Sequence, residues 1–150
     1  MKSAIIIGAS GGIGAALVDA LRDEGDYAVT ALARSFTGDA HIDLADEASI
    51  AAAAERCALL APELIILTTG LLHEAENGPE KAYRDLDGEW MARQFAINAI
   101  GPALVAKHFL PVMKPAGIVR FAALSARVGS ISDNRLGGWY GYRASKAALN

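Results

Sequence analysis

A tyrosine and a lysine near the end of the chain, Tyr142 and Lys146, have the residue types and the spacing needed for proton transfer. A tyrosine hydroxyl ordinarily titrates near pH ~10, so its use as a general acid or base at neutral pH requires a nearby positive charge. A lysine four residues later on a helix provides that charge, because residues i and i+4 share a helix face. Tyr140 has Ala144 at that position, so we choose Tyr142 as the proton donor. Without other motifs, such a pair is also typical of an ordinary solvated helix face.

A glycine-rich segment near the N-terminus, Gly8-Ala9-Ser10-Gly11-Gly12-Ile13-Gly14, has the composition of a phosphate-binding loop. Glycines allow a tight backbone turn and a close approach to a pyrophosphate, and the N–H groups and positive dipole end of a following helix attract phosphates. The segment lies between a β-branched apolar run and an amphipathic pattern, which is the strand-to-helix position of such loops. Glycine-rich turns also occur in proteins that bind no nucleotide, but this placement favours nucleotide binding.

Alternating strand and helix patterns must position these two motifs. Short apolar runs bounded by glycine indicate buried parallel strands, and apolar residues spaced by three or four indicate helices packed on a sheet. The alternation predicts an α/β fold, a doubly wound parallel sheet of Rossmann type with three α/β/α layers and right-handed crossovers. The predicted strands are residues 4–7, 27–33, 41–44, 64–67 and 118–124, and the predicted helices are 13–24, 46–60, 87–101, 102–109 and 139–150.

Two details of the helices are specific enough to be checked. In the first helix, Ile13, Leu17, Ala20 and Leu21 recur at helical spacing and are predicted to face the sheet. Pro102 is predicted to begin a new helix, because a proline in a helix interior would cost about 3 kcal/mol.

Composition limits the class of protein. The 150-residue chain has 14 Lys+Arg, 17 Asp+Glu, 53% apolar residues and one cysteine, which predicts a single domain over residues 1–150 with a sizeable core, no disulfide and no nucleic-acid partner. Scattered histidines indicate no metal site. No apolar run approaches the ~20 residues of a membrane span and no signal peptide is present, so we expect a cytoplasmic protein without a membrane partner. The chain stops at Asn150 inside a helical pattern, so we expect it to continue, with residues 1–150 an N-terminal portion and the fold C-terminally incomplete.

The two motifs together resemble those of the short-chain dehydrogenase/reductase family. The spacing Gly-x-x-x-Gly-x-Gly of residues 8–14 differs from the Gly-x-Gly-x-x-Gly dinucleotide fingerprint and is similar to that family's glycine motif. Residues 142–146, Tyr-Arg-Ala-Ser-Lys, match its Tyr-x-x-x-Lys in the expected order, and the resemblance covers the whole chain. Residues 129–140, followed by this motif, are similar to the branch of C-factor and sniffer-type carbonyl reductases.

The resemblance implies further catalytic residues. The family's serine after the fifth strand falls on Ser125 of Ser125-Ala126-Arg127-Val128-Gly129, where the second serine of the usual Ser-Ser-x-x-Gly is missing, and Ser130 and Ser132 stay open as substitutes. Asn98 matches the helix asparagine that supports a proton relay to the lysine, although a structural role for this asparagine is an alternative.

The resemblance also implies a nicotinamide dinucleotide as cofactor. Asp43 and Leu44 match the pair that contacts the adenine, although Asp43 could instead be a loop or capping residue. Arg34, after the second strand, suits the 2′-phosphate of NADP, where NAD enzymes carry a carboxylate; NADP is therefore favoured, with NAD possible. Leu67-Thr68-Thr69-Gly70 replaces the usual Asn-Asn-Ala-Gly, and the threonine hydroxyls could partly replace the asparagines. The implied cofactor-binding residues are Gly8, Ser10, Gly12, Ile13, Gly14, Arg34, Asp43, Leu44, Gly70 and Lys146.

Three functions are compatible with this sequence. The first is an NADP(H)-dependent carbonyl reductase or alcohol dehydrogenase acting on a small molecule, with Tyr142 as general acid/base and Lys146, Ser125 and Asn98 in support. The second is a C-factor-like nucleotide-binding signalling or regulatory protein with little turnover. The third is an inactive remnant or isolated cofactor half. For the intact protein the resemblance implies a homo-oligomer, a dimer or a tetramer.

Overall fold

A computed structural model describes residues 1–150 of the chain, which divide into two compact units. The first unit comprises Met1–Thr69 and Ala103–Leu124, and the second comprises Gly70–Pro102 and Ser125–Asn150. The glycine loop therefore belongs to the first unit, whereas Tyr142 and Lys146 belong to the second.

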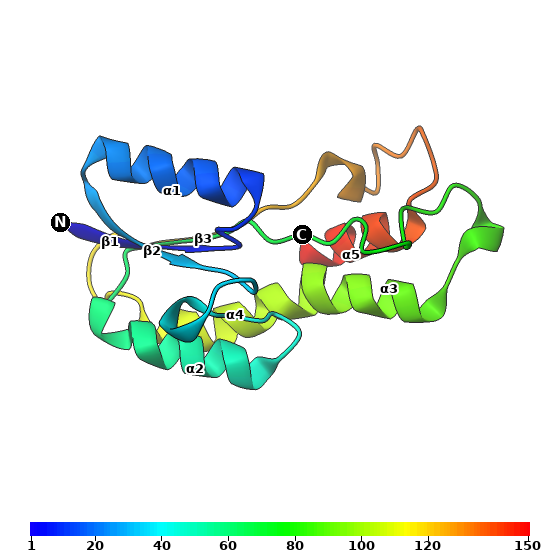
Figure 1. The fold of residues 1–150 in the computed structure, drawn as a ribbon. Coiled ribbons are helices and arrows are strands. Elements are labelled where there is room, and N and C mark those ends of the chain that lie inside the picture. Colours follow the sequence, from blue (N-terminus) through cyan, green and yellow to red (C-terminus); the bar gives the residue numbers. More distant parts are fainter. The chain divides into compact units, whose positions relative to one another are not determined.

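A parallel sheet of four strands forms the centre of the first unit (Figure 1). Its strands are β1 (Lys2–Ile7), β2 (Tyr27–Leu32), β3 (Leu64–Leu67) and β4 (Arg120–Ala123), in the order β2-β1-β3-β4. β1 pairs with both β2 and β3, so Ile5 lies opposite Thr30 on one side and Ile65 on the other. The chain adds strands first to one side of β1 and then to the other, so the carboxyl ends of β1 and β3 lie where the strand order reverses. This is the position at which open α/β sheets bind ligands.

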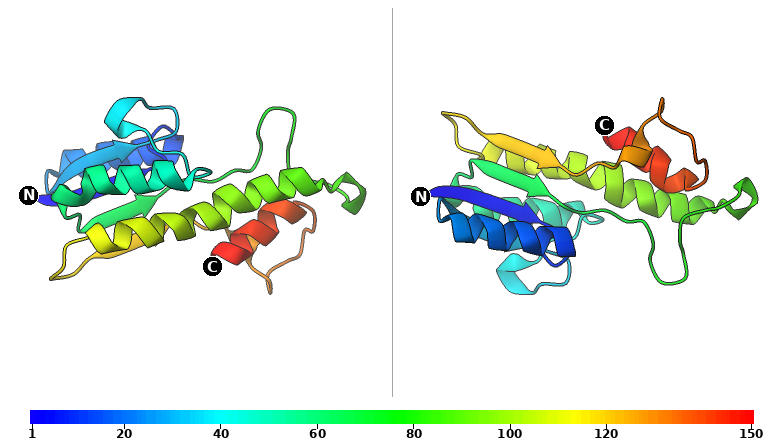
Figure 2. Two further views of the ribbon diagram at one scale, coloured as in Figure 1. Left: turned by 90° about the horizontal axis from the view of Figure 1, so that it is seen from below. Right: turned by 90° about the horizontal axis from the view of Figure 1, so that it is seen from above.

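Helices cover both faces of this sheet, which confirms the predicted three-layer α/β/α class. Helix α1 (Gly12–Glu24) lies on one face, and α2 (Glu47–Cys57) and α4 (Gly101–Phe109) lie on the other, as the views from above and below show (Figure 2). The residues Ala4–Ile7 of β1 are completely buried between these layers. Such burial on both faces explains why the strand is a continuous apolar run without polar alternation.

Two predictions for the first unit are wrong in detail. Residues 41–44 do not form a strand: only His41 makes an isolated bridge, to Ala33, because the chain turns at Asp43 into α2. In α1 the predicted apolar face is correct only in part: Leu21 packs against the core and Leu17 is half-buried, whereas Ile13 is 62% exposed and the buried residues are Gly14 and Val18. Gly14 has no side chain, so the apolar spacing does not mark it as a contact residue. The close approach of α1 to the Gly8 carbonyl nevertheless depends on this glycine.

The second unit is built on two helices with long connecting loops. Helix α3 (Gly88–Phe95) starts at the N-cap Asp87, whose carboxylate accepts a hydrogen bond from the Trp90 N–H at 2.7 Å. A π-helical turn (Ala96–Ile100) follows, and α5 (Tyr140–Leu149) packs against both. Short 3₁₀ turns elsewhere in the chain cover Gly38–Ala40, Ala58–Leu60, Tyr83–Asp85, Leu110–Val112 and Arg127–Gly129.

The predicted helix break at Pro102 does not occur. The helix runs continuously through Pro102, and the π-helical turn immediately precedes Gly101 and Pro102. Because proline has no N–H to donate to the carbonyl four residues earlier, a widened turn before it accommodates the missing bond without ending the helix.

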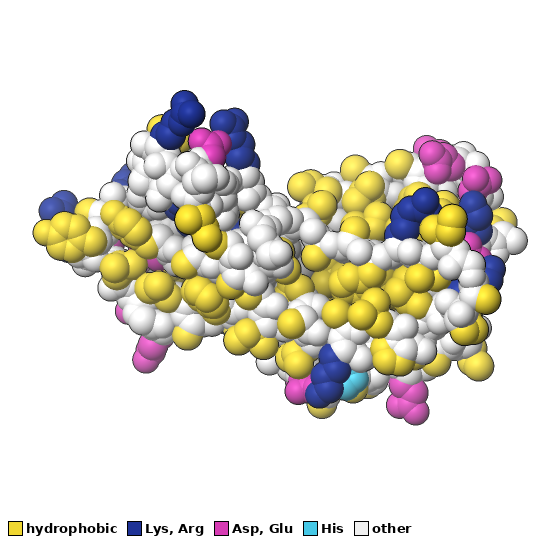
Figure 3. Space-filling view, turned by 180° about the vertical axis from the view of Figure 1, so that it is seen from behind, with side chains coloured by type: hydrophobic (Ala, Val, Ile, Leu, Met, Phe, Trp, Pro, Cys, Tyr) yellow, Lys and Arg dark blue, Asp and Glu magenta, His cyan; other side chains and the backbone are white.

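The same helical stretch, Gly88–Val112, is long and apolar enough to cross a membrane when judged by length and composition alone. Core helices of soluble proteins also pass this test, and this stretch contains the buried polar side chains of Gln94 and Asn98. Apolar side chains gather on the face drawn in Figure 3. The exposed apolar residues of the chain include Ile100 and Leu110 of this stretch and Ile118 and Val119 before β4.

Candidate active site

The glycine loop follows β1 and leads directly into α1, so its predicted place between strand and helix is confirmed. Gly8 has φ +92°, a left-handed conformation that side chains rarely adopt, and its N–H and that of Ala9 both donate to the Leu32 carbonyl, at 2.8 and 3.1 Å. A Cβ at Gly14 would overlap the Gly8 carbonyl oxygen and lie 2.7 Å from Thr68 Oγ1. The loop therefore requires glycine at positions 8 and 14.

The outer part of the loop is open. Ser10, Gly12 and Ile13 are exposed, and a Cβ at Gly12 would meet no atom within 4 Å. Helix α1 has no acidic residue in its first turn and no side chain that caps its N-terminus. The N–H groups and the positive dipole end of this helix therefore face an open, glycine-lined space, which fits the pyrophosphate of a dinucleotide.

Thr68 holds the loop in place from the end of β3. Its Oγ1 lies 3.0 Å from the Ile7 carbonyl oxygen and 3.1 Å from that of Gly8, to which its hydroxyl can donate. Thr68 thus bonds to the loop from one of the positions where the family resemblance has an asparagine. Thr69 does not share the role, because its Oγ1 is buried without a hydrogen-bond partner.

The residues predicted to contact the rest of a nucleotide lie beyond β2. Arg34 is exposed, two residues after β2 ends. Asp43 uses Oδ1 to accept from the Ala45 N–H at 2.9 Å, so its carboxylate shapes the turn into α2, the local role that the sequence leaves open. Leu44 is buried in the core.

In the second unit, Tyr142 and Lys146 lie one turn apart on α5, as predicted. The Lys146 Nζ is 5.9 Å from the centroid of the Tyr142 ring, and Lys146 is only 2% exposed. The ring of Trp139 meets the Tyr142 ring edge-on, with centroids 6.3 Å apart and an interplanar angle of 76°. The phenol ring thus has both an aromatic ring and an ammonium group as neighbours.

Burial governs the titration of this pair. Burial raises the pKa of Tyr142 above its ordinary value of 10.0, because the phenolate would lose solvation. For the same reason, burial lowers the pKa of Lys146 below its ordinary value of 10.5. The positive charge that the sequence places beside Tyr142 would lower its pKa, whereas burial shifts the pKa in the opposite direction. The attraction of an ammonium 5.9 Å from the ring centroid does not offset the loss of solvation.

A buried hydrogen-bond network holds the middle of α5. Asn98 Oδ1 accepts from the Leu71 N–H at 2.6 Å, and Asn98 Nδ2 donates to the Leu71 carbonyl and to Ser145 Oγ, both at 3.0 Å. Ser145 in turn donates to the Tyr142 carbonyl at 2.8 Å. Both amide donors of Asn98 are used, so its side chain fastens the segment after β3 to α5. This is the structural role that the sequence leaves as an alternative.

Two glycines border the side chain of Lys146. A Cβ at Gly70 would lie 3.5 Å from Lys146 Nζ, and a Cβ at Gly129 would lie 2.9 Å from Lys146 Cβ. The structure therefore brings Gly70, Asn98, Tyr142 and Lys146 together, as predicted from four separate sequence positions. Gly129 joins them because only a glycine lets the loop after β4 approach α5 so closely.

The candidate serines differ in their surroundings. Ser125 is exposed just after β4. Ser130 Oγ accepts from the Asp133 N–H at 3.1 Å and lies 3.4 Å from Ser132 Oγ, so these two hydroxyls help to form a loop turn. Of the three candidate serines, only Ser125 has a hydroxyl that takes no part in this turn.

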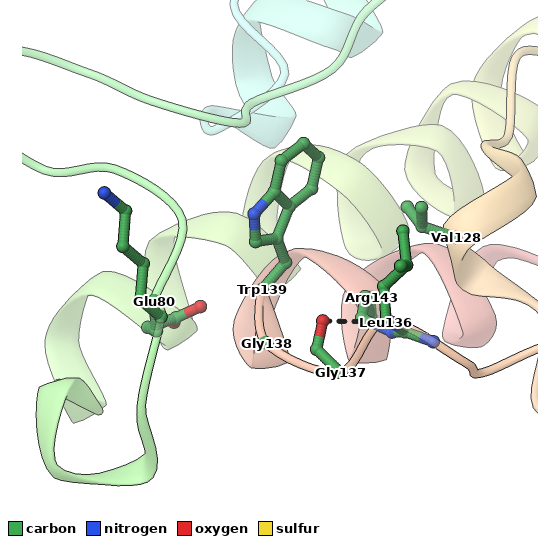
Figure 4. A pocket seen from close by; sticks show the side chains of 8 residues that line it. Glu80, Val128, Leu136, Gly137, Gly138, Trp139 and Arg143 are labelled. Carbon is green, nitrogen blue, oxygen red and sulfur yellow. Dashed lines mark hydrogen bonds between the residues drawn. The ribbon is translucent and has the colours of Figure 1, made fainter.

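A cavity of about 320 Å³ lies beside the start of α5 (Figure 4). The Trp139 ring forms one wall, and Arg143, which donates to the Gly137 carbonyl at 3.3 Å, forms another. The lining residues are Glu80, Lys81, Val128, Leu136, Gly137, Gly138, Trp139 and Arg143. The cavity therefore combines apolar walls with two cationic side chains.

Sequence reasoning misses two residues of this unit, Ser145 and Glu80. Ser145 is visible as a hydroxyl beside the lysine of the Tyr-x-x-x-Lys motif, and its position one turn after Tyr142 could have indicated a bond to the helix backbone. Glu80 has no comparable signal, since it is one acidic residue in a polar loop, yet it is 4% exposed.

Comparison with known proteins agrees with these motifs. Residues 8–150 match the family described as enoyl-(acyl carrier protein) reductase. C-signal of Myxococcus xanthus is 46% identical over 69 residues, which are 46% of this chain and 42% of C-signal. The 1-hydroxy-2-glutathionyl-2-methyl-3-butene dehydrogenase of Rhodococcus sp. (strain AD45) is 29% identical over 160 residues, covering 100% of this chain and 67% of that enzyme. The matched segments thus cover less than half of C-signal and about two thirds of the dehydrogenase.

Solved structures share the fold. The alcohol dehydrogenase from the archaeon Thermococcus sibiricus, complexed with 5-hydroxy-NADP, superposes with a TM-score of 0.81 at 24% identity, covering 99% of this chain and 67% of that one. The carbonyl reductase Sniffer of D. melanogaster gives a TM-score of 0.78 at 22% identity, with 99% and 71% covered. With the matched family over residues 8–150, the fold and the two motifs, the chain belongs to the short-chain dehydrogenase/reductase family.

Proposed function

We propose that the protein is an NADP(H)-dependent oxidoreductase that interconverts a carbonyl and a hydroxyl group, with Tyr142 as its general acid/base. The observation that carries this proposal is the Tyr142–Lys146 pair on α5, whose Nζ and ring centroid are 5.9 Å apart beside Gly70 and the Asn98 network. The relative named a dehydrogenase supports the same reaction class.

The direction of proton transfer follows from the protonation state of Tyr142. Because burial raises the pKa of Tyr142, its hydroxyl holds a proton at neutral pH and can donate it to a substrate carbonyl oxygen during reduction. In the reverse direction the hydroxyl of an alcohol substrate returns that proton to Tyr142. The buried side chain of Lys146 lies beside the ring to favour the phenolate and to bond a ribose hydroxyl. A nicotinamide cofactor, when bound, supplies or accepts the hydride.

Two other residues would support these steps. The Ser125 hydroxyl, exposed at the end of β4, would donate to the substrate oxygen and orient it. Asn98 would act through the helix: its bonds to Leu71 and Ser145 keep α5 in register with the segment that contains Gly70. We therefore assign the Asn98 side chain a positioning role in place of a direct part in a proton relay.

The cofactor would lie on the glycine loop, with its pyrophosphate at the N-terminus of α1 and contacts from Gly8, Ser10, Gly12, Ile13 and Gly14. We propose NADP(H) over NAD(H) because the segment after β2 offers the Arg34 guanidinium and no carboxylate to a ribose 2′ substituent. Replacing Arg34 by alanine should weaken NADPH binding about tenfold or more and leave NADH binding unchanged, as measured by fluorescence titration. Equal losses for both cofactors would contradict the phosphate contact.

The main test compares two tyrosines of the same helix in the whole protein. Tyr142→Phe removes the proton donor and should lower kcat about 10²- to 10⁴-fold, whereas the cofactor dissociation constant should not change. Tyr140→Phe is the matched control, because Tyr140 is exposed two residues away and has no lysine four residues later. Wild-type turnover by Tyr142→Phe would rule out the assignment.

The substrate class, the cellular compartment and the oligomeric state complete the proposal. We propose a small-molecule carbonyl or alcohol as substrate, since one named relative is a dehydrogenase and the two named structures are a carbonyl reductase and an alcohol dehydrogenase. We further propose a cytoplasmic protein that assembles into a dimer or tetramer, as the family resemblance implies. Size-exclusion chromatography with light scattering checks the assembly, and a monomer would contradict it.

A second candidate is a nucleotide-binding signalling or regulatory protein. It is favoured by the 46% identity to C-signal over 69 residues and by Ala126, which stands where the family normally has its second serine. This function predicts cofactor binding without turnover of any carbonyl in a broad panel. Rapid reduction of several carbonyls would exclude it.

A further inference from the structure

The first turn of α5 carries Tyr142 but has no cap of its own. Its N-cap residue is Trp139, which makes no side-chain hydrogen bond to the helix, and no acidic residue lies in the first turn. The first N–H groups of a helix need acceptors, and the positive end of the helix dipole favours a negative charge nearby. The acceptor at this helix comes from elsewhere in the second unit.

Glu80, from the loop after β3, accepts hydrogen bonds from two N–H groups at this helix end, one at its backbone carbonyl and one at its carboxylate. Its carbonyl oxygen accepts from the Trp139 N–H at 2.6 Å, and both of its carboxylate oxygens lie 3.3 Å from the Gly141 nitrogen, which donates to them. Glu80 therefore binds the N-cap Trp139 and also Gly141, the second residue of the helix, which lies 61 positions further along the chain. Only 4% of Glu80 is exposed, so this carboxylate is committed to the helix end and not to solvent.

The backbone before Tyr142 is shaped to make this contact. Gly137, Gly138 and Trp139 all have positive φ, at 64°, 64° and 53°, although such values are unusual for a residue as bulky as tryptophan. A Cβ at Gly138 would lie 3.1 Å from the Glu80 carbonyl oxygen. The chain thus makes a tight left-handed approach that brings the helix end onto Glu80.

Gly141 leaves the space that the carboxylate occupies. A Cβ there would lie 2.9 Å from Glu80 Oε1 and would overlap Oε1 of Gln94, a completely buried side chain whose amide atoms have no hydrogen-bond partner. Two buried polar side chains therefore converge on one glycine at the start of α5. A larger residue would displace the carboxylate from the helix end.

We propose that Glu80 is a positioning residue, which caps the first turn of α5 and thereby fixes the place of Tyr142 for proton transfer. The inference rests on the proposed function of Tyr142. Lys146 lies one turn further on, next to Ser145, where the Asn98 network holds the helix independently of Glu80. Loss of Glu80 therefore affects the rate of proton transfer more than the binding of a cofactor to Lys146.

The test measures kcat and the NADPH dissociation constant of the whole protein with Glu80→Ala and Glu80→Gln, and with Glu76→Gln as control. Glu76 is an exposed acid of the same loop. Glu80→Ala should lower kcat about tenfold to a hundredfold, because small displacements of a catalytic group are costly. Glu80→Gln keeps an acceptor oxygen and should lose only about threefold. The NADPH dissociation constant should stay within about twofold throughout, and Glu76→Gln should match the wild type.

Hydrogen exchange gives a readout that does not depend on activity. Without Glu80, peptides covering residues 139–143 should exchange faster, whereas peptides covering 145–149 should keep wild-type rates. A uniform increase over both regions would show general loosening and overturn the positioning role. If Glu80→Ala does not fold, Glu80→Asp, which keeps the charge but shortens the reach, takes its place with the same expected rate loss.

The two proposals fail in different ways. A wild-type kcat for Glu80→Ala or Glu80→Asp, with Tyr142→Phe inactive, would overturn the role of Glu80 and leave the proposed function standing. Activity in Tyr142→Phe would overturn the proposed function, and the exchange comparison would still decide whether Glu80 holds the first turn.

Discussion

The two units of the chain are stabilised by different chemistry. The buried residues of the first unit are almost all aliphatic or aromatic, whereas every buried polar or charged residue belongs to the second unit: Glu80, Gln94, Asn98, Ser145 and Lys146. The first unit buries a sheet between helices, and its glycine loop is held largely by backbone bonds and one threonine hydroxyl. The second has no sheet and connects its helices to loops through buried polar side chains.

The fold of each unit therefore depends on its sequence in a different way. Apolar packing tolerates many side chains of similar volume, so its pattern is redundant along the sequence. A buried polar network depends on each partner, because a donor or acceptor left alone loses its solvation without compensation. The unit that carries the acid/base pair is therefore the one in which single polar substitutions should have the larger functional consequences.

The largest expected loss of stability comes from the apolar unit. Phe109 is completely buried in α4, and Phe109→Ala should lower the free energy of unfolding by about 3–5 kcal/mol through lost burial and a cavity. Its neighbour Leu110 is 50% exposed, so Leu110→Ala is a matched control that should cost far less. Urea denaturation followed by circular dichroism measures both. Similar losses for the two variants would contradict the assigned core.

The polar unit gives the next largest effect. Asn98→Leu keeps the approximate volume but leaves the Leu71 N–H and carbonyl without partners, and should cost about 2–4 kcal/mol. The apolar replacement is the informative one, because leucine would be tolerated if this region were held by packing. Wild-type stability of Asn98→Leu in the same denaturation assay would remove the contrast between the units.

Two glycines of one loop provide a matched pair of substitutions that tests the packing of the first unit. Gly14→Ala should cost about 1–3 kcal/mol, since its Cβ would overlap the Gly8 carbonyl oxygen. Gly12→Ala, two residues earlier, adds a methyl group to open space and should leave the melting temperature nearly unchanged. Thermal denaturation compares the pair directly, and a reversed order would mean that the loop is folded differently.

The smallest expected effect is the pH dependence from Lys146. Its folded pKa lies below the ordinary 10.5, so between those two values the unfolded chain binds more protons than the folded one. The free energy of unfolding of the wild type, relative to Lys146→Met, should therefore rise with pH up to 10.5 and level off above it. Tyr142 acts in the opposite direction only above pH 10, so the rise below pH 10 reports Lys146. A relative stability that falls over this range would contradict the burial of Lys146.

The sequence predicts much of the first unit because the signals there are local and repeated. The apolar runs that become β1 and β3, the loop glycines and the amphipathic pattern of residues 13–24 each indicate their own local structure. The predicted strand at residues 41–44 fails because a short apolar run next to Asp43 does not distinguish a strand from a turn. The face of α1 is predicted only in part, because its closest contact is made by Gly14, which has no side chain for the apolar spacing to mark.

The second unit is harder to predict because its contacts join residues far apart in the chain. Tyr142, Lys146 and Asn98 are found through motifs, but nothing in the sequence pairs Glu80 with Gly141 or Asn98 with Leu71. The titration of Tyr142 is also beyond sequence reasoning. Spacing predicts the charged neighbour, whereas the pKa direction depends on burial, which only the fold determines.

The most direct test of the account separates cofactor binding from chemistry in the whole protein. NADPH binding and single-turnover hydride transfer would be measured side by side for Gly12→Val and Tyr142→Phe. Gly12→Val places a side chain at the open end of the glycine loop, and should bind NADPH weakly while remaining folded. Tyr142→Phe should bind NADPH as the wild type does and transfer hydride about 10²- to 10⁴-fold more slowly. Wild-type hydride transfer by Tyr142→Phe, or wild-type NADPH binding by Gly12→Val, would contradict the account.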